Sequence, residues 1–364
     1  MIVELRQLND ILKEASKLGI KGKKALVKIY KDELDNSFID IFKDDALYQS
    51  PIAAHWKPSE KDTYFIAFSD VPNLTGILEL TPKEVKIVDG DNESSFKLAG
   101  YEDLQHNDFI TMPYASVTVE HANVSTDIDD LKLAESLVKS GELISIYPKH
   151  IMCSPNLRYG GYIIPTENNT DRKFCVSKNG IKALECSTSG SVPISYSTGD
   201  NQNGVQIRTN RYVYSERLDT VKRQPDKVPG RYMAISQVLI NEFDMWDENH
   251  TVKFIPSVDF IDYVTKLDTE LARYITFTGK KGSKEVHVKI GDDVDIQTVF
   301  HNHNELEMDL AMHLDMKLAE PYFKNLKKYG GSIEYRPRTF MCRFRYSKRN
   351  FSGFLLGLKM RGVR

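Results

Sequence analysis

Hydrophobic and polar residues change period repeatedly along this chain, from the two-residue alternation typical of strands to the 3.6-residue spacing typical of helices. A short alternating run at Ile2–Leu5 is followed by Gln7–Leu18, in which apolar residues recur on one helical face. Gly19 ends this helix, because glycine readily adopts the left-handed backbone found at helix ends. Three strands are predicted next, at Ala25–Lys31, Phe38–Phe42 and Ala46–Ala53. The first unit is therefore a strand, a helix and further strands.

The C-terminal third repeats this order with the clearest pattern. Ser257 is the predicted N-cap of a helix at Val258–Leu267, since its hydroxyl can accept a hydrogen bond from a free N–H of the first turn. A second helix at Lys317–Tyr329 is stopped by Gly330 and Gly331. The predicted strands around these helices are His250–Pro256, Ala272–Thr278, Glu285–Ile290, Val294–Phe300, Leu310–Met316, Ser332–Tyr335, Thr339–Tyr346 and Phe351–Met360.

The middle of the chain is less regular. Helices are predicted at Asp127–Val138 and Met233–Trp246, and a short one at Val71–Leu78. The predicted strands there are Tyr64–Phe68, Val85–Val88, Ser95–Leu98, Val117–Glu120, Tyr162–Pro165, Lys173–Val176, Ile181–Cys186 and Val192–Tyr196. The strand–helix–strands order thus begins near residues 1, 115, 250 and 310, and with a weaker signal near 64 and 230. Its spacing of about 50 to 60 residues indicates an internal structural repeat.

This order of elements predicts an α+β fold in which each unit has a sheet on one side and a helix on the other. The 364 residues exceed one core of typical size, so two or three domains are expected. We place the domain boundaries at 1–108, 109–249 and 250–364. The middle range fits the repeat poorly and is long for one domain, which indicates either a divergent domain or an insertion.

Composition favours a reducing compartment. The four cysteines form no Cys-x-x-Cys pair, which argues against a structural zinc site or a redox pair. The N-terminal residues lack the apolar core of a signal peptide. The longest apolar run, near Phe354–Leu358, is far too short to cross a bilayer. We therefore expect a cytoplasmic or nuclear protein with no membrane contact, and the cytoplasm is the compartment we assign.

The net charge of −2 conceals an uneven distribution of charge. Lys317–Arg364 carries 13 Lys and Arg against two acidic residues, and Met1–Lys31 carries eight basic residues against three acidic ones. Asp32–Asp45 carries six acidic residues and one lysine. Basic ends beside an acidic stretch predict a surface that faces a polyanion on an otherwise acidic protein. Ordinary solvated charge is the alternative explanation of the same counts.

Candidate catalytic chemistry is sparse. The densest group of metal-ligand residue types is His301, His303, Glu305, Glu307, Asp309 and His313. A His-x-His pair on one strand face can chelate a metal, but the acids alternate with Leu306 and Met308 as on an exposed connector. Lys280–Lys284 lacks the first glycine of a phosphate-binding loop, and no Ser, Cys or Thr has a recognisable His/Asp setting. We predict no catalytic residue, no metal, no cofactor and no enzymatic activity.

Both ends of the chain resemble the DNA polymerase sliding clamps of bacteria and phages. At the C-terminus, Met312–Met316, the helix at Leu318–Lys328 and the final strand with its ending Phe354–Arg361 resemble the last unit of a bacterial clamp. At the N-terminus, Met1–Leu5 and the helix at Leu8–Leu18 resemble a clamp's first unit. The resemblance covers roughly residues 1–108 and 250–364 and is one of pattern.

This resemblance implies the sliding-clamp fold, with sheets outside and helices inside a ring closed by a homo-oligomer. Three domains per chain imply a ring dimer, and two imply a trimer. The implied function is that of a DNA polymerase processivity factor, which encircles double-stranded DNA without reading its sequence and tethers the polymerase. DNA polymerase and a clamp loader are the implied protein partners. The divergent middle suggests a virus-encoded clamp, which would act in the host cytoplasm.

The resemblance also implies binding residues. Sliding needs an attraction to phosphates that ignores sequence, which flexible lysine side chains supply. The predicted DNA-binding residues are helix lysines, namely Lys13, Lys17, Lys132, Lys139, Lys266, Lys324, Lys327 and Lys328. By resemblance, the terminal strand contributes to an apolar pocket for partner peptides, so Leu358 and Met360 are the predicted partner-binding residues. Solvated lysines and ordinary core residues are the alternatives.

Two other functions fit parts of the sequence. A viral structural protein of a tail or baseplate would also be rich in strands, Tyr and Asn. A single-stranded nucleic-acid-binding protein would use the basic, aromatic segment Arg336–Arg349, with Phe340, Phe344 and Tyr346 stacking on bases. A closed ring that stimulates polymerase, copurification with virions, or a preference for unpaired DNA would distinguish the three.

Overall fold

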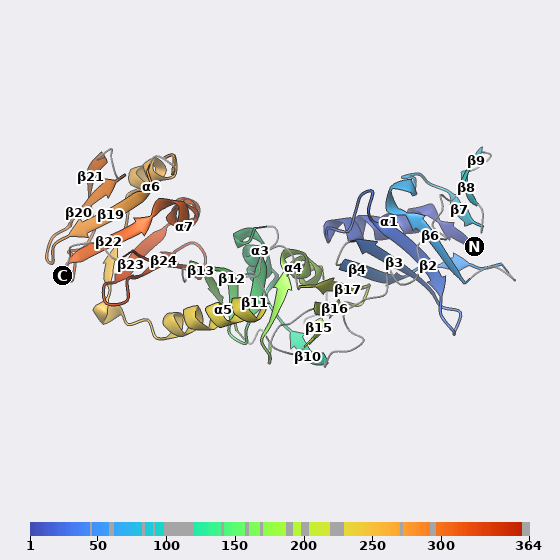
Figure 1. Ribbon diagram of the computed structural model, residues 1–364, viewed down its shortest axis with the longest axis horizontal. Helices are drawn as coiled ribbons and strands as arrows, with labels where there is room; N and C mark the ends of the chain where they lie inside the picture. The colour runs from blue at the N-terminus through green and yellow to red at the C-terminus, as the bar shows by residue number, and fades with distance from the viewer. Residues whose placement is uncertain are drawn as a thin grey trace. The chain divides into compact units, whose positions relative to one another are not determined.

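The computed structural model of the chain describes residues 1–43, 46–57, 62–81, 84–89, 92–97, 119–139, 142–156, 160–167, 170–186, 192–197, 204–218, 229–269, 272–291 and 296–358 (Figure 1). The chain divides into two compact units. Unit 1 comprises Met1–Pro148 and Asn168–Arg231, and unit 2 comprises Lys149–Glu167 and Tyr232–Arg364.

Along the chain, the order strand, helix, three strands occurs six times in the described residues, once with a single 3-10 turn in place of the helix. The first copy is β1 (Ile2–Glu4), α1 (Leu5–Lys17), β2 (Leu26–Lys31), β3 (Ser37–Lys43) and β4 (Ala46–Pro51). The second is β6 (Thr63–Ala67), the 3-10 turn η1 (Phe68–Asp70), β7 (Ile77–Leu80), β8 (Glu84–Asp89) and β9 (Asn92–Lys97). The third is β10 (Val119–Val124), α3 (Ile128–Leu137), β11 (Leu143–Ile146), β12 (His150–Asn156) and β13 (Gly160–Pro165).

The remaining copies complete the chain. The fourth is β14 (Phe174–Ser177), α4 (Lys178–Glu185), β15 (Val192–Ser197), β16 (Gly204–Arg208) and β17 (Val213–Arg217). The fifth is β18 (Val252–Phe254), α6 (Val258–Val264), β19 (Tyr274–Gly279), β20 (Glu285–Ile290) and β21 (Ile296–His301). The sixth is β22 (Leu310–Asp315), α7 (Met316–Tyr329), β23 (Gly331–Arg336), β24 (Met341–Tyr346) and β25 (Phe351–Leu356). The elements outside the repeat are β5 (Ala54–His55), α5 (Pro229–Asp244) and the 3-10 turn η4 (Glu248–His250).

Unit 1 contains two large antiparallel sheets, in the strand orders β5-β1-β7-β8-β9 and β10-β15-β16-β17-β4-β3-β2-β6. Every second residue of β2 points into the core, so Val27 and Ile29 are buried while Lys28 is partly exposed. The helix α1 buries a stripe of residues spaced by three and four, including Leu5, Leu8 and Leu12. These two periods are what the sequence predicted, because each element has one side against the core.

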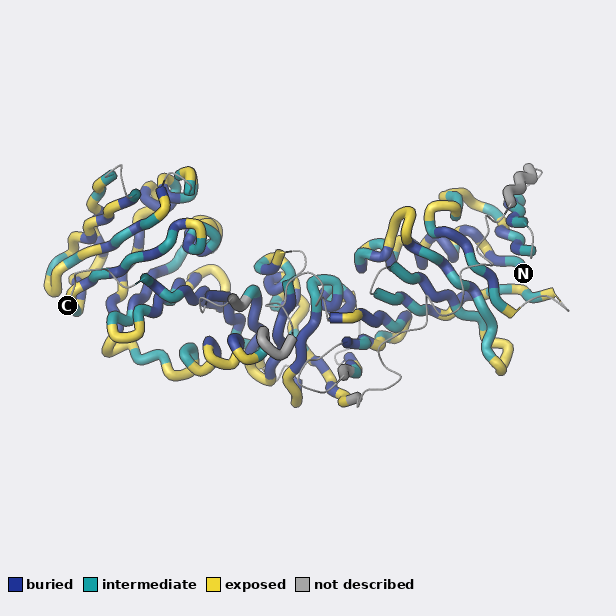
Figure 2. Tube along the Cα trace, viewed as in Figure 1, coloured by how far each residue is buried: buried dark blue, intermediate teal, exposed yellow. Residues whose placement is uncertain are grey.

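Unit 2 contains β12-β13-β25-β24-β23-β18 in that order, and a second antiparallel sheet β21-β20-β19-β22. The helix α7 joins the cores of both sheets through Phe323, whose ring lies 6.4 Å from Phe277 of β19 and 5.7 Å from Phe344 of β24. All three side chains are fully buried. At α6, the predicted cap is confirmed, because Ser257 Oγ accepts a hydrogen bond from Phe260 N at 3.2 Å. Figure 2 shows buried stretches in dark blue along the strands of this unit.

The predicted helix at Val71–Leu78 is wrong. Only the turn η1 forms there, and the chain then enters β7. Gly76 has φ +110°, and a Cβ at this position would lie 2.4 Å from Val88 O, so the chain passes close to β8 in a conformation unsuited to a helix. The backbone carbonyls of this stretch bond to a side chain instead of to a helix. Asn9, buried in α1, donates from Nδ2 to Pro72 O at 3.1 Å and to Leu74 O at 3.3 Å.

The predicted strand at Ile181–Cys186 is also wrong, because α4 occupies this segment. Ser177 caps it by accepting from Asn179 N and Gly180 N. Gly180 lies in the first turn of α4, where a Cβ would lie 2.7 Å from Glu216 Oε1, so a larger residue would clash. The fourth copy therefore begins at Phe174, and the predicted copy near residue 230 is wrong since α5 is a helix outside the repeat.

Asp40 of β3 gives unit 1 a pH-dependent stability. Its side chain is buried and accepts from Gln49 Nε2 at 3.0 Å. Burial raises the pKa of Asp40 from 3.8 to about 6, although Gln49 and the charge of Lys28 oppose this shift. The folded state therefore binds this proton more tightly than the unfolded state, so the contribution of Asp40 to stability is greatest below pH 3.8 and is lost as the pH rises through about 6.

We expect Asp40→Asn to remove this loss. At neutral pH the variant should be more stable than the original protein by about 3 kcal/mol, since one pKa unit corresponds to about 1.4 kcal/mol. Urea unfolding at a series of pH values measures the difference. Glu33→Gln, at an exposed position of the same hairpin, is the control and should leave the pH profile unchanged. An Asp40→Asn variant with an unaltered profile contradicts this account.

Candidate nucleic-acid interface

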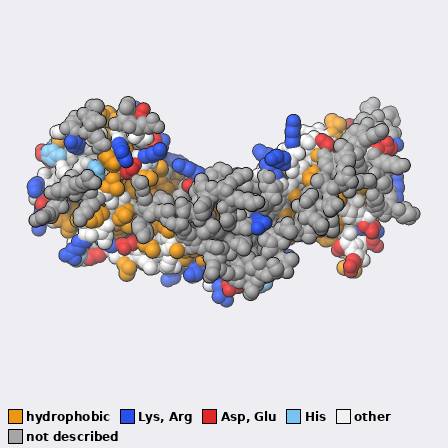
Figure 3. Space-filling model, viewed as in Figure 1, with side chains coloured by type: hydrophobic (Ala, Val, Ile, Leu, Met, Phe, Trp, Pro, Cys, Tyr) orange, Lys and Arg blue, Asp and Glu red, His pale blue; other side chains and the backbone are white. Residues whose placement is uncertain are grey.

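The exposed face of α7 carries four lysines. Lys317, Lys324, Lys327 and Lys328 are exposed, while the opposite face buries Met316, Ala319, Tyr322, Phe323 and Leu326. Asp315 caps the helix by accepting from Leu318 N at 3.3 Å, and Gly330 ends it. Lys and Arg side chains are visible in blue over this part of unit 2 in Figure 3. Lys317 was not among the predicted residues, although its spacing of seven from Lys324 places it on the same face.

The α7 lysines already have acidic neighbours. Lys324 Nζ lies 2.6 Å from Glu320 Oε1 on the same helix, and Lys327 Nζ lies 3.0 Å from Asp262 Oδ1 of α6. Lys328 Nζ lies 4.8 Å from the centre of the Tyr329 ring. Exposed pairs of this kind contribute only about 0 to 1 kcal/mol. These lysines can therefore exchange their partners for phosphates at low cost.

The exposed face of α1 is the second basic face. Arg6, Lys13 and Lys17 lie along it with one acid, Asp10, which accepts from Lys13 Nζ at 3.3 Å. The predicted residues Lys13 and Lys17 are thus on one face, and Arg6 joins them through the helical spacing. Sequence reasoning passed over Arg6 because it precedes the start of the predicted helix by one residue.

The other predicted lysines also lie near acidic residues. Lys132 is exposed on α3, and Lys139 is exposed two residues beyond its end. The first turn of α3 carries Asp129 and Asp130. Lys266 is exposed just after α6, which carries Asp259 and Asp262. A phosphate approaching these lysines meets carboxylates as well, as it does at α7, where Glu320 and Asp262 pair with Lys324 and Lys327.

The missed helix α4 adds two lysines to unit 1. Lys178 and Lys182 are half-buried, and their Nζ atoms lie 3.9 Å and 3.5 Å from Glu135 Oε1 of α3. The pair of helices α3 and α4 is therefore held together by charge as well as by apolar packing. Because the strand prediction put residues 181–186 in a sheet, these lysines had no place among the predicted DNA-binding residues.

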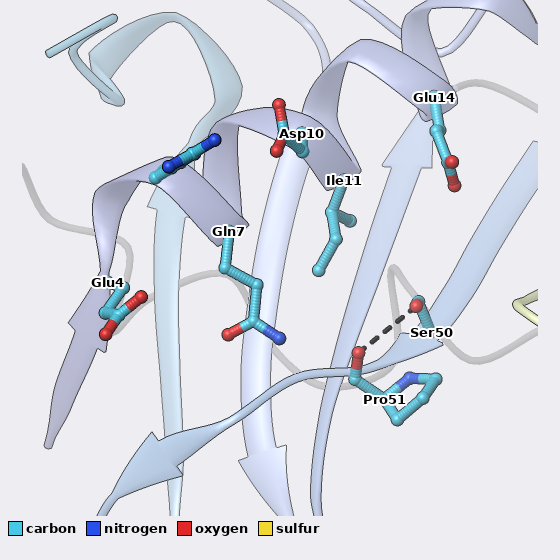
Figure 4. Close-up of a pocket in the computed structure, with 8 residues that line it drawn as sticks. Glu4, Gln7, Asp10, Ile11, Glu14, Ser50 and Pro51 are labelled. Atoms are coloured by element: carbon cyan, nitrogen blue, oxygen red, sulfur yellow. Dashed lines mark hydrogen bonds between the residues drawn. The ribbon is translucent and has the colours of Figure 1, made fainter. Parts of the chain in front are cut away.

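A pocket of about 390 Å³ lies beside α1 (Figure 4). Its lining includes the acids Glu4, Asp10 and Glu14, and Ser50 and Pro51 close it from β4. Glu14 Oε2 accepts from Tyr48 OH at 2.9 Å, and its Oε1 lies 3.5 Å from Arg211 Nη1. No titratable pair in the pocket suggests acid–base chemistry among the described residues.

The predicted partner-binding residues are only partly described. Leu358 is half-buried and lies beyond the end of β25, where its N–H donates to His313 O at 2.8 Å. Met360 lies outside the described residues. The backbone after β25 therefore runs along β22, and the side chain of Leu358 is partly open to solvent.

The metal-binding and base-stacking candidates from the sequence do not form a site in the described residues. In the described part of the chain, no group of three or more His, Cys, Asp or Glu side chains is placed to hold a metal ion. Phe344 and Tyr346 of the suggested base-stacking segment are buried in the core, which leaves no stacking surface on either ring. No described helix is both long enough and apolar enough to cross a membrane.

The architecture can be compared with solved structures. The β clamp of Helicobacter pylori, solved with 5-chloroisatin, aligns over 99% of this chain and 100% of that chain, with a TM-score of 0.62 and 11% identity. The β subunit of DNA polymerase III from Thermotoga maritima aligns over 99% of both chains, with a TM-score of 0.60 and 14% identity. The Pseudomonas aeruginosa β subunit gives a TM-score of 0.61 at 8% identity, with 99% of both chains covered. The chain has the fold of the bacterial β sliding clamps.

The sliding-clamp fold explains the sixfold repeat and extends to the part of the chain that the sequence left open. The predicted clamp fold is confirmed, and the alignment over nearly the whole chain includes the middle third. No model of a known protein family matches the sequence, and no curated protein matches it. At identities between 8% and 14%, the likeness is carried by core pattern and element order.

Proposed function

We propose that this protein is a DNA polymerase processivity factor, a sliding clamp that encircles duplex DNA and tethers replication proteins. The clamp fold over the whole chain, combined with the four exposed lysines of α7, is the observation that supports this function most directly. Flexible lysine side chains attract phosphates at any sequence, as a sliding ring requires. The role is topological and non-enzymatic, and it places the protein in the cytoplasm, or in the host cytoplasm if it is virus-encoded.

The proposed ring is a homo-oligomer closed through sheet edges. Three clamp domains at 1–108, 109–249 and 250–364 would make it a dimer. In the described sheets, β9 and β21 are edge strands. β22 is the other edge of the sheet that contains β21, and its His313 O accepts a hydrogen bond from Leu358 N. Unpaired edge strands invite pairing with another chain. A head-to-tail contact between β9 of one subunit and β21 of the next is the closure we propose.

Partner binding is proposed by analogy. The H. pylori β clamp has been solved bound to a DNA ligase peptide. We infer that DNA polymerase and a clamp loader present comparable peptides to this chain. Leu358, half exposed after the terminal strand, and Met360 remain the proposed contacts at the end of the chain.

The decisive experiment is topological. A ring loaded on a nicked circular duplex should stay bound through a wash at high salt and should dissociate once a restriction enzyme linearises the circle, because it slides off the new ends. Gel filtration of the complexes before and after cleavage measures this. A protein that is released equally from circular and linear DNA, or is retained on both, is not a clamp. A preference for unpaired DNA would favour the single-strand-binding alternative.

A further inference from the structure

The helix α5 lies outside the repeat, and its last turn packs on the terminal strand. Phe243 and Trp246 place their rings 6.2 Å and 5.8 Å from the ring of Phe354 in β25, both edge-on. Phe243 lies in the last turn of α5 and Trp246 two residues beyond its end, and both rings contact the same phenylalanine. We call Phe243–Trp246 the aromatic turn. The six strand–helix–strands copies are complete without it.

Two arginines hold the aromatic turn against the sheet. The guanidinium of Arg336 in β23 lies 4.4 Å from the centre of the Trp246 ring, and that of Arg343 in β24 lies 5.1 Å from the Phe243 ring. Their side chains are only 13% and 12% exposed. Stacking of cations on aromatic rings is strongest at such desolvated positions. We call Arg336, Arg343 and Phe354 the docking face.

Acidic groups complete the contact. Arg336 Nη1 donates to Glu242 Oε2 at 2.8 Å, and its Nη2 donates to Met245 O at 3.1 Å. Next to the docking face, His150 Nε2 of β12 lies 3.3 Å from Asp244 Oδ1. The docking face therefore recognises a segment at a helix end with two aromatic rings three positions apart and carboxylates beside them.

The fit of the aromatic turn is incomplete. Trp246 Nε1 and Arg336 Nε are both buried without a hydrogen-bond partner among the described residues. Each buried, unsatisfied donor costs about 1 to 3 kcal/mol. Met245, within the turn, is 67% exposed. By contrast, Leu239 and Ile240 in the preceding turn are buried and anchor the rest of the helix.

We propose that the docking face binds an acidic segment of a partner protein carrying two aromatic residues three positions apart, and that the aromatic turn covers this face until such a segment displaces it. Of the two unsatisfied donors, Arg336 Nε belongs to the docking face, so a partner that places a carboxylate near it would gain a hydrogen bond that the chain's own turn does not make. This proposal rests on the proposed clamp function for the identity of its partners as replication proteins. The aromatic, cationic and hydrogen-bonding contacts that carry it do not involve DNA.

Trp246 itself reports on the displacement. The chain has two tryptophans, so Trp56→Phe leaves Trp246 as the single fluorophore. The probe is a synthetic peptide of Leu239–Glu248 carrying Trp246→Phe, which has the aromatic spacing and no tryptophan. Added to the full chain, it should shift Trp246 emission to longer wavelength and raise acrylamide quenching at least twofold, with saturation. The same peptide with alanine at both aromatic positions should do neither.

Phe243→Ala should lower the peptide concentration at half-saturation at least tenfold, because the chain's own turn then competes less well. Val238→Ala, at an exposed position of α5, is the matched control and should leave it unchanged. In the unaltered protein, amide hydrogen exchange should be faster at Phe243–Trp246 than in β24. Exchange as slow as in β24, no displacement by the peptide, or displacement by a short oligothymidylate instead, would each overturn the proposal.

These results separate the two proposals. If the peptide displaces Trp246 but the protein is not retained on circular DNA, the docking face stands and the clamp function falls. If the protein is retained on circular DNA and the peptide has no effect, the clamp function stands and α5 is a fixed part of the core.

Discussion

Replacing Lys317, Lys324 and Lys328 together by glutamine should weaken binding to duplex DNA by about tenfold to a hundredfold at low salt. The three side chains share the exposed face of α7 and have no backbone role, so the helix and its buried Phe323 should be unaffected. Removing one lysine–phosphate interaction should make the plot of log affinity against log salt less steep by about 0.9, and removing three should do so by about 2.7. Fluorescence anisotropy with a labelled duplex over a salt series gives both quantities.

The matched control lies in the same unit. Lys280, Lys281 and Lys284 are exposed lysines on the connection between β19 and β20, away from any helix. Their triple replacement by glutamine changes the net charge equally. If both triples weaken binding alike, the attraction arises from overall charge, and the assignment of DNA contacts to α7 fails.

Much of the fold follows from local periodicity. The helices α1, α3 and α7 and most strands of the terminal thirds form where the sequence predicts them, because each has a strong apolar stripe and a clear end signal. Gly330 illustrates the point, since it ends α7 at the predicted residue with φ +63°. The clamp fold itself was predicted from the order of elements at the two ends.

The errors have a common physical cause. At α4, eight residues make too few turns for a distinct helical period. Gly180 also predicts a break in a helix, although the folded protein needs a glycine there because a Cβ would clash with Glu216. At Gly76, a close approach to the backbone of β8 decides the conformation. Both outcomes depend on residues far away in sequence. Local pattern contains no record of such contacts.

The candidate DNA-binding site was predicted to a similar degree. Lys13, Lys17, Lys324, Lys327 and Lys328 lie on the exposed faces of helices, where the pattern placed them. Lys178 and Lys182 were missed with their helix. The difference between the basic face of α7 and the mixed face of α3 depends on neighbouring acids such as Glu135, which only the folded arrangement identifies.

Gly331→Ala should be among the most destabilising substitutions in unit 2. A Cβ at this residue would lie 1.9 Å from Arg345 O, and its φ of +143° is unsuited to a side chain. The clash is with backbone of the paired strand β24, which cannot move without breaking the register in which Gly331 faces Tyr346. We expect a loss of about 3 kcal/mol or more in the free energy of unfolding.

The neighbouring glycine makes the prediction specific. Gly330→Ala has the same composition change, but a Cβ there meets only Ser347 Oγ at 3.1 Å, and φ is +63°. Its cost should be about 1 to 3 kcal/mol, the strain of a side chain at a positive φ with an extended ψ of 174°, and Gly330→Asn should cost about as much because this ψ lies outside the left-handed helical region that asparagine tolerates. Urea unfolding of the three variants compares them. If Gly331→Ala lowers the free energy of unfolding no more than Gly330→Ala does, the close pairing of β23 and β24 is wrong. The sheet would then not hold Phe344 firmly against Phe323, and the basic face of α7 would lack a rigid support.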